Sequence, residues 1–316
     1  MRVFPFLSSL LLTLIGCGTT EFITDVSATG DIGVTTGGVQ DINLAREIIE
    51  SGYIPAASTF TTEGLFSQHD LPLSGAQCDE VLCPRAAAST FNPVSESEEQ
   101  LLIQLGFGTN IDAESFSRRP LNLGVSVDVS GSMGTSKMEA VKTALHVLVD
   151  QLNEGDRMAL VSFNGTARLL QSSTIMTQAG RQQMHQTVDA LYADGGTNIE
   201  DGMSMAFENV FEVLSESGVE NRVMLFTDAQ PNVGETNPES FVGISRSYSD
   251  EGIGLSVFGV GLDLGTDLAL EVANTRGGNY FFLSDNESIK QVFDQDFDYM
   301  VPPVAYDLEV SATVEP

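Results

Sequence analysis

The feature that most constrains the fold is the segment LNLGVSVDVSGSMG, which runs from Leu121 to Gly134. Its aliphatic residues alternate along the chain and end at a cluster of Gly and Ser, a pattern typical of a buried strand that leads into a loop. Residues two apart in an extended backbone point the same way, so Asp128, Ser130 and Ser132 can face one site as the strand ends. One carboxylate and two hydroxyls form a set of hard oxygen ligands that suits Mg²⁺, Mn²⁺ or Ca²⁺.

Strand and helix patterns alternate from residue 121 to residue 300. This alternation predicts an α/β fold, a doubly wound and mostly parallel sheet with helices on both faces. The predicted strands cover residues 121–129, 157–163, 222–227, 254–260 and 279–283, with a short antiparallel edge strand at 167–170. The predicted helices cover residues 137–152, 181–193, 199–215, 240–251, 268–275 and 289–300.

Two later positions add oxygen ligands to the same region. Thr197 lies in the Gly-rich sequence GGTN and opens a predicted helix, and Asp228 ends the apolar run RVMLFTD. Asp128 and Asp228 therefore follow two strands of one parallel sheet. We expect the site at the carboxyl ends of these strands, near the reversal of strand order where such sheets bind ligands.

These residues give the sequence a family resemblance. D-x-S-x-S at Asp128, Ser130 and Ser132, then Thr197 in a Gly-rich loop, then Asp228 after a hydrophobic strand, resembles the von Willebrand factor type A domain with its metal-ion-dependent adhesion site. The resemblance covers residues 121–300. It implies that the three hydroxyls ligate a divalent cation directly, Mg²⁺ before Mn²⁺ or Ca²⁺, and that the two carboxylates bind it directly or through water.

The resemblance also implies a protein partner. Neutral hydroxyl ligands leave the cation short of negative charge, so an Asp or Glu carboxylate from another protein can complete the octahedron. Such a site would serve cell adhesion or protein binding, not catalysis. Taken singly, Asp128 and Asp228 could be turn residues, and Ser130 and Ser132 could cap the next helix; the set of five favours the metal site.

Two other functions remain open from the sequence. One is a metal-independent structural or assembly component of the cell envelope, which would not require all five site residues. The other is a Mg²⁺-dependent phosphoryl-transfer enzyme, but only Lys137 lies near enough in sequence to hold a phosphate. His69, His146 and His185 are dispersed, and the sequence has no catalytic triad or phosphate loop. We therefore predict that the chain is not an enzyme.

The first residues indicate export. A basic start and the apolar residues 3–15 are followed by Leu14-Ile15-Gly16-Cys17, which resembles a bacterial lipobox. The resemblance implies a signal peptide at 1–16, lipidation of Cys17 and attachment to the bacterial cell envelope, at the outer membrane where there are two. The alternative is an ordinary secretory peptide with an incidental Cys17. Residues 17–43 are rich in Gly, Thr and Asp and predict a flexible tether from the membrane.

Flanking segments surround the α/β region. Residues 44–120 form an N-terminal extension with a predicted helix at 44–51, a strand at 98–111, and Cys78 and Cys83, which are predicted to pair as a disulfide in an oxidising compartment; metal binding by the two thiols is the weaker alternative. Residues 301–316 alternate apolar and polar side chains and predict a C-terminal strand. Strands on both sides of the α/β domain suggest a partial or truncated β-sandwich.

Charge excludes one class of partner. Lys and Arg number 14 and Asp and Glu number 44, a net charge of −30 at pH 7. Nucleic-acid binding rests on positive charge against phosphates, so it is excluded for this chain.

Overall fold

The protein is represented by a computed structural model. It describes residues 43–55, 57, 60, 78–92, 98–112, 116–214, 218–228, 232–234, 237–260, 275–283, 293–294, 297–305 and 308–311. The predicted signal peptide and lipidation site lie outside these ranges, and so does the tether predicted at 17–43 except for its last residue, Asn43, which begins a helix. Residues 268–274 of the helix predicted at 268–275 also lie outside them. Within the described ranges, no helix is both long and apolar enough to cross a bilayer.

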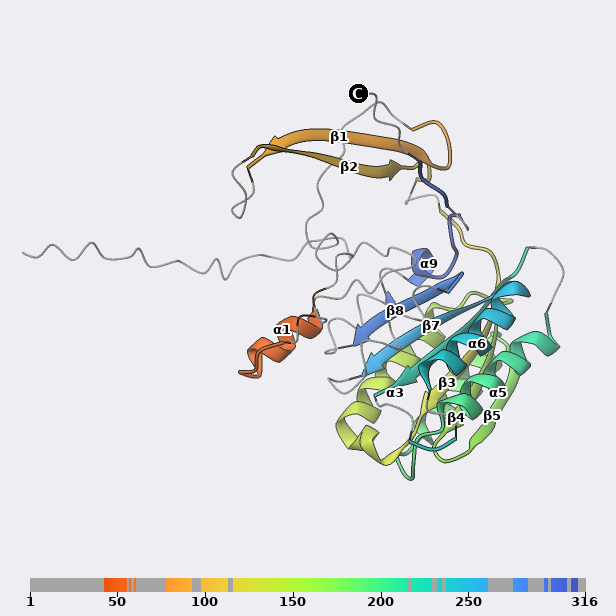
Figure 1. Ribbon diagram of the computed structural model, residues 1–316. Coiled ribbons are helices and arrows are strands. Elements are labelled where there is room, and N and C mark those ends of the chain that lie inside the picture. The colour runs from red at the N-terminus through yellow and green to blue at the C-terminus, as the bar shows by residue number, and fades with distance from the viewer. Residues whose placement is uncertain are drawn as a thin grey trace, which may run out of the picture. The chain divides into compact units, whose positions relative to one another are not determined.

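The main body is a six-stranded sheet in the order β5-β4-β3-β6-β7-β8 (Figure 1). The strands are β3 (Leu121–Asp128), β4 (Arg157–Phe163), β5 (Ala167–Ile175), β6 (Glu220–Thr227), β7 (Ile253–Val260) and β8 (Gly278–Leu283). All neighbouring pairs are parallel except β4 with β5, which are antiparallel. The predicted doubly wound α/β fold is therefore confirmed, including its antiparallel edge strand.

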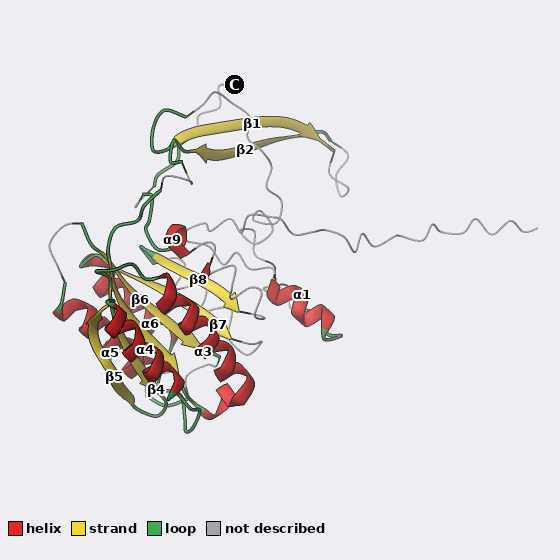
Figure 2. Cartoon of the chain, turned by 180° about the vertical axis from the view of Figure 1, so that it is seen from behind, coloured by secondary structure: helices red, strands yellow, loops and turns green. Residues whose placement is uncertain are grey.

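Helices cover both faces of this sheet (Figure 2). One apolar cluster joins β3 to α3 (Gly134–Gln151) and α4 (Gln178–Asp189), and also contains Phe293 and α9 (Phe297–Met300). The other cluster joins the sheet to α5 (Ile199–Glu212) and α6 (Pro238–Asp250). Each face thus has its own hydrophobic core, as a sheet buried on both sides requires.

Small residues on β3 let α5 lie close to the sheet. Odd-numbered residues of β3 join the first cluster, whereas its even-numbered residues are Asn122, Gly124, Ser126 and Asp128. A Cβ at Gly124 would lie 2.8 Å from the carbonyl oxygen of Ala206 in α5. The close approach fixes the position of α5, whose first turn follows Thr197 at the edge of the sheet.

A separate two-stranded antiparallel sheet lies in the N-terminal extension. It consists of β1 (Cys83–Phe91) and β2 (Gln100–Gly108). A disulfide joins Cys83 to Cys78, and a short helix, α1, spans Asn43–Glu50. The sequence predicted β2 and α1 but not β1, because its segment CPRAAASTF is rich in Ala, which is depleted in strands.

Of the strand predicted at 301–316, the structure describes nine residues. Residues 301–305 and 308–311 form no strand in the structure. Alternating side chains create a strand only where another strand is available to pair with the backbone. In the described ranges the second sheet consists of β1 and β2. Of the helix predicted at 289–300, the structure describes Phe297–Met300 as α-helix.

Candidate metal centre

The site begins where two neighbouring central strands end. β3 and β6 are hydrogen-bonded in parallel, with Val127 beside Phe226. Asp128 is the last residue of β3, and Asp228 directly follows β6. Both carboxylates are fully buried. Parallel pairing of the two strands therefore delivers two acidic side chains to the same edge of the sheet.

Asp128 is a fixed, buried carboxylate. Its Oδ1 accepts a hydrogen bond from the backbone N–H of Ser130 at 2.8 Å, and its Oδ2 accepts one from the Thr227 hydroxyl at 2.7 Å. Burial raises the pKa of Asp128, and the nearby charge of Asp228 raises it further, while hydrogen bonds from Ser130 and Thr227 act in the opposite direction. The group therefore pays a desolvation cost when ionised, which a nearby cation would offset.

A chain of oxygen atoms connects the remaining ligands. The Ser130 and Ser132 hydroxyl oxygens lie 3.0 Å apart, and the Ser132 hydroxyl donates to Asp228 Oδ1 at 2.8 Å. Adjacent ligands of an octahedral Mg²⁺ ion, each about 2.1 Å from the metal, lie about 3.0 Å apart. The longer bonds of Ca²⁺ would separate them by about 3.3–3.7 Å. The observed separations of 3.0 and 2.8 Å are those of ordinary hydrogen bonds, and they are also close to the spacing of adjacent Mg²⁺ ligands.

Lys137 brings positive charge to the same carboxylate. This residue lies in the first turns of α3, and its Nζ donates to Asp228 Oδ2 at 2.6 Å. One Asp228 oxygen thus accepts a hydrogen bond from the Ser132 hydroxyl, and the other accepts one from the Lys137 ammonium group. The sequence marked Lys137 only as a nearby basic residue and gave no sign of this ion pair.

Backbone contacts connect the loop of Thr197 to both other segments. Gly131 N donates to Gly195 O at 3.0 Å, which holds the loop against the serine segment. Thr197 N donates to Asn232 Oδ1 at 2.9 Å, and Asn232 N donates back to Thr197 O at 3.1 Å. Thr197 is 1% exposed. The structure thus brings Asp128, Ser130, Ser132 and Asp228 into direct contact, and it connects Thr197 to them through the backbone.

Sequence reasoning missed the residues that hold the loops together. Asn164 Nδ2 donates to Asp194 O at 3.0 Å, and Asn198 N donates to Asn164 O at 2.7 Å. Asn232 plays a similar part on the other side of Thr197. The strands predicted at 157–163 and 167–170 place Asn164 in the connection between them, but nothing local in the sequence marks Asn232.

Among the described residues, no group of three or more His, Cys, Asp or Glu side chains is placed to hold a metal ion. The candidate centre differs from such sites because three of its five proposed ligands are hydroxyls. Two carboxylates and three hydroxyls match the oxygen ligands that Mg²⁺ accepts. The residues present therefore fit a hard divalent cation.

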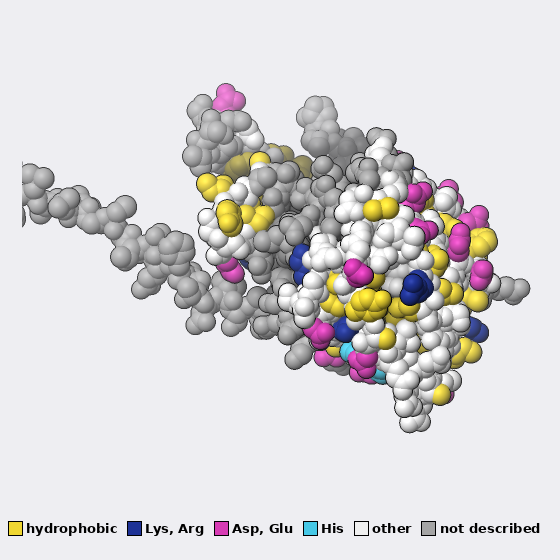
Figure 3. Space-filling model, turned by 90° about the horizontal axis from the view of Figure 1, so that it is seen from below, with side chains coloured by type: hydrophobic (Ala, Val, Ile, Leu, Met, Phe, Trp, Pro, Cys, Tyr) yellow, Lys and Arg dark blue, Asp and Glu magenta, His cyan; other side chains and the backbone are white. Residues whose placement is uncertain are grey.

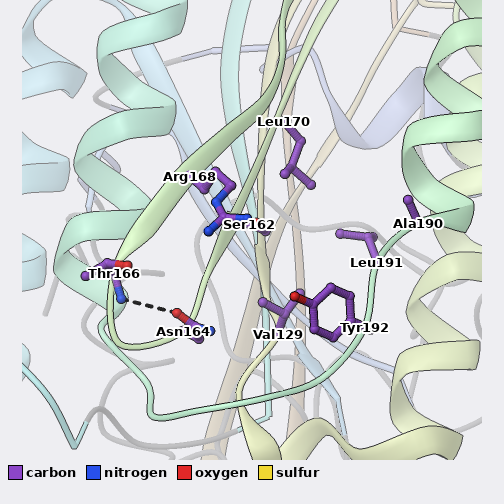
Figure 4. Close-up of a pocket in the computed structure, with 9 residues that line it drawn as sticks. All are labelled: Val129, Ser162, Asn164, Thr166, Arg168, Leu170, Ala190, Leu191 and Tyr192. Atoms are coloured by element: carbon purple, nitrogen blue, oxygen red, sulfur yellow. Dashed lines mark hydrogen bonds between the residues drawn. The ribbon is translucent and has the colours of Figure 1, made fainter.

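A small pocket lies next to the D-x-S-x-S segment (Figure 4). Its volume is about 90 Å³, well below the roughly 300–1,000 Å³ of pockets that enclose drug-sized ligands. The pocket is lined by Val129, Ser162, Asn164, Thr166, Arg168, Leu170, Ala190, Leu191 and Tyr192. Its size is too small to enclose a substrate of that class beside the candidate centre.

Comparisons with known proteins agree with this fold. The sequence is 24% identical over 295 residues to the uncharacterized protein YfbK of Escherichia coli (strain K12), covering 92% of this chain and 50% of that protein. It is 32% identical over 171 residues to human inter-alpha-trypsin inhibitor heavy chain H4, covering 52% of this chain and 18% of that one. The chain thus spans half or less of the length of these relatives.

A solved structure shares the architecture. A von Willebrand factor type A protein from Catenulispora acidiphila superposes with a TM-score of 0.50 at 18% identity, covering 72% of this chain and 52% of that one. Residues 122–295, more than half of the chain, match the von Willebrand factor type A domain. The chain therefore belongs to the von Willebrand factor type A domain family, whose members are interaction domains that commonly bind a divalent cation.

Proposed function

We propose that the protein is a cell-envelope lipoprotein that binds a protein partner through a divalent cation held by Asp128, Ser130, Ser132, Thr197 and Asp228. The observation that carries this proposal is the continuous contact from Ser130 through Ser132 to Asp228 beside the buried Asp128. As a member of a family of interaction domains, the chain is not an enzyme. A metal-independent envelope component, the alternative function, would not require this arrangement of hydroxyl and carboxylate groups.

We propose Mg²⁺ as the preferred cation, with Mn²⁺ as the closest substitute, because two carboxylates and three hydroxyls are hard oxygen ligands. When bound, the cation would supply a Lewis-acidic position that accepts a carboxylate oxygen. Ser132 is exposed, whereas the other four proposed ligands are at most 1% exposed. We infer that the partner approaches from the side of Ser132 and offers an Asp or Glu side chain.

The lipobox supports attachment to a bacterial membrane through Cys17, with the outer membrane as the expected location where two membranes exist. The anchor and the tether would present the domain at the envelope surface. Mass spectrometry of the N-terminal peptide should find a diacylglyceryl group on Cys17. An unmodified Cys17 in protein purified from the membrane of the native host would exclude the anchor.

The cation site is tested by replacing Asp228. Isothermal titration of Mg²⁺, Mn²⁺ and Ca²⁺ into the full chain should show saturable binding at one site, tightest for Mg²⁺ or Mn²⁺. Asp228→Ala should abolish this binding, because it removes a ligand and leaves the Lys137 ammonium in the site. Asp250→Ala, which removes an exposed acid at the end of α6, is the matched control. Equal affinity in the Asp228 and Asp250 variants would exclude the proposed site.

Lys137 is expected to weaken cation binding. Its ammonium occupies Asp228 Oδ2, so an incoming cation must compete with a positive charge already present. Lys137→Met keeps most of the aliphatic stem and removes the charge, and should tighten Mg²⁺ binding about tenfold, or about 1.4 kcal/mol. Lys142→Met, further along α3, should leave the affinity unchanged. Weaker binding by the Lys137 variant would show instead that the ammonium holds Asp228 in its ligating position.

A further inference from the structure

A histidine pair joins α3 to α4 away from the proposed adhesion site. His146 of α3 and His185 of α4 face each other with their Nδ1 atoms 2.7 Å apart. Their ring centroids are 5.0 Å apart and their planes differ by 28°. The centroid distance exceeds the nitrogen distance by about two ring radii, so the rings meet edge to edge and the two nitrogens point at each other.

The outer nitrogens of both rings lie against carboxylates. His146 Nε2 lies 3.0 Å from Asp189 Oδ1, and His185 Nε2 lies 3.1 Å from Asp150 Oδ1. A carboxylate only accepts hydrogen bonds, so each Nε2 must carry a proton and donate it. In the neutral form of each ring, the proton on Nε2 leaves a lone pair on Nδ1. Two lone pairs at 2.7 Å repel each other unless a cation lies between them.

We propose that the Nδ1 atoms of His146 and His185 form a second binding site, specific for a borderline transition-metal ion such as Zn²⁺, Ni²⁺ or Cu²⁺. Imidazole nitrogen is a preferred ligand of these ions. The outer carboxylates complete the arrangement found at many metal sites, in which a ligating His donates its other N–H to a carboxylate that fixes the tautomer and orients the ring. Here both ligands have such a partner.

Metal binding requires the rings to separate and to turn. Two nitrogens bound to a tetrahedral Zn²⁺ at about 2.0 Å lie about 3.3 Å apart. The rings would therefore separate by about 0.6 Å, and each would turn by about 35° so that both lone pairs point at the ion; water would fill the remaining positions. Both His side chains are about one-third exposed, at 32% and 30%, so an ion reaches them from solvent. Figure 3 shows His side chains in cyan at the surface beside acidic side chains in magenta.

This site is distinct from the proposed adhesion site. His146 lies nine residues after Lys137 on the same helix, which corresponds to about 13 Å along its axis. The nearby charges are Asp150, Asp189 and Lys142, whose Nζ donates to the carbonyl oxygen of Asp189 at 3.1 Å. The two sites also differ in chemistry, since one offers oxygen ligands to a hard ion and the other offers nitrogen ligands to a softer one.

A bridging proton is the alternative occupant of the gap, and the titration separates the two. Zn²⁺, Ni²⁺ and Cu²⁺ are titrated into the full chain carrying Asp228→Ala, so that the adhesion site does not contribute. We expect saturable binding of one equivalent, tightest for Cu²⁺. The bound Cu²⁺ should show nitrogen ligation in its electron paramagnetic resonance spectrum.

Variants then assign the ligands. His146→Gln and His185→Gln, each in the same background, should weaken binding at least tenfold, whereas His69→Gln should not change it. Asp150→Asn and Asp189→Asn keep both imidazoles and should weaken binding about tenfold, which tests the site even if a His variant folds poorly. No saturable binding, or binding unchanged in both His146→Gln and His185→Gln, would overturn the proposal and leave the bridging proton as the explanation.

Discussion

Replacing Asp156 by alanine is expected to lower the free energy of unfolding by about 3–5 kcal/mol. Asp156 accepts two hydrogen bonds from the Arg118 guanidinium, at 3.1 and 2.6 Å, and both side chains are 1% exposed. It also accepts the backbone N–H groups of Leu121 at 2.8 Å and Asn153 at 2.6 Å. The substitution leaves a buried positive charge and two backbone donors without this partner.

Urea denaturation measures the effect, and Asp298 provides the control. Asp298 Oδ1 accepts from Arg118 Nε at 2.7 Å, but the side chain is 50% exposed. Asp298→Ala should therefore change the unfolding free energy by about 1 kcal/mol or less, because an exposed ion pair is screened by water. Similar losses of unfolding free energy in the two variants would mean that burial does not determine how strongly the ion pair of Arg118 and Asp156 stabilises the fold.

The Asp128→Asn variant is expected to be more stable than the wild type without metal and less stable than the wild type with metal. The folded state raises the pKa of Asp128 through burial. A carboxyl whose pKa is higher in the folded state binds its proton more readily there, so metal-free stability falls as pH rises through that pKa. Asparagine keeps an acceptor for Ser130 N and removes the charge. At pH 7 without metal, the variant should be more stable than the wild type and less dependent on pH.

With saturating Mg²⁺ the order should reverse. A ligand at one hundred times its dissociation constant adds about 2.7 kcal/mol to the stability of the folded state. The wild type should gain this amount, and Asp128→Asn should gain little because it lacks the charge that the cation neutralises. Thermal unfolding in chelator and in Mg²⁺ gives the comparison, with Asp250→Asn as the control. If wild type and Asp128→Asn keep the same order in both conditions, the buried charge is not the ligand proposed.

The strands of the main sheet could be predicted because each is a buried apolar run. The predicted strand at 157–163 coincides with β4, and the strands predicted at 222–227 and 254–260 differ from β6 and β7 by two residues or one at their starts. Helix ends were harder, since they depend on single side chains. The Thr177 hydroxyl accepts from Gly180 N and begins α4 before the predicted start at 181.

The sequence motif identified the proposed metal ligands, but it could not identify the residues that form hydrogen bonds with them. Thr227 donates to Asp128 across 99 residues of sequence, and Lys137 reaches Asp228 across 91. No local pattern encodes such contacts, because they exist only once strand order is set. Long-range pairing also explains two differences outside the main sheet: β1 was missed, and the described part of the segment at 301–316 forms no strand. Both depend on the presence of a partner strand, not on the segment alone.

The position of Asp128 and Asp228 at the ends of β3 and β6 has a mechanical consequence. These two strands are hydrogen-bonded neighbours in the middle of the sheet, with two further strands on each side. A pulling force on a partner bound at the carboxyl ends of these strands would be transmitted to the sheet through its two central strands. It would not pass through a surface loop or through a strand at the side of the sheet. Because these strands run parallel and end at the loaded edge, the pull would act along both in the same direction.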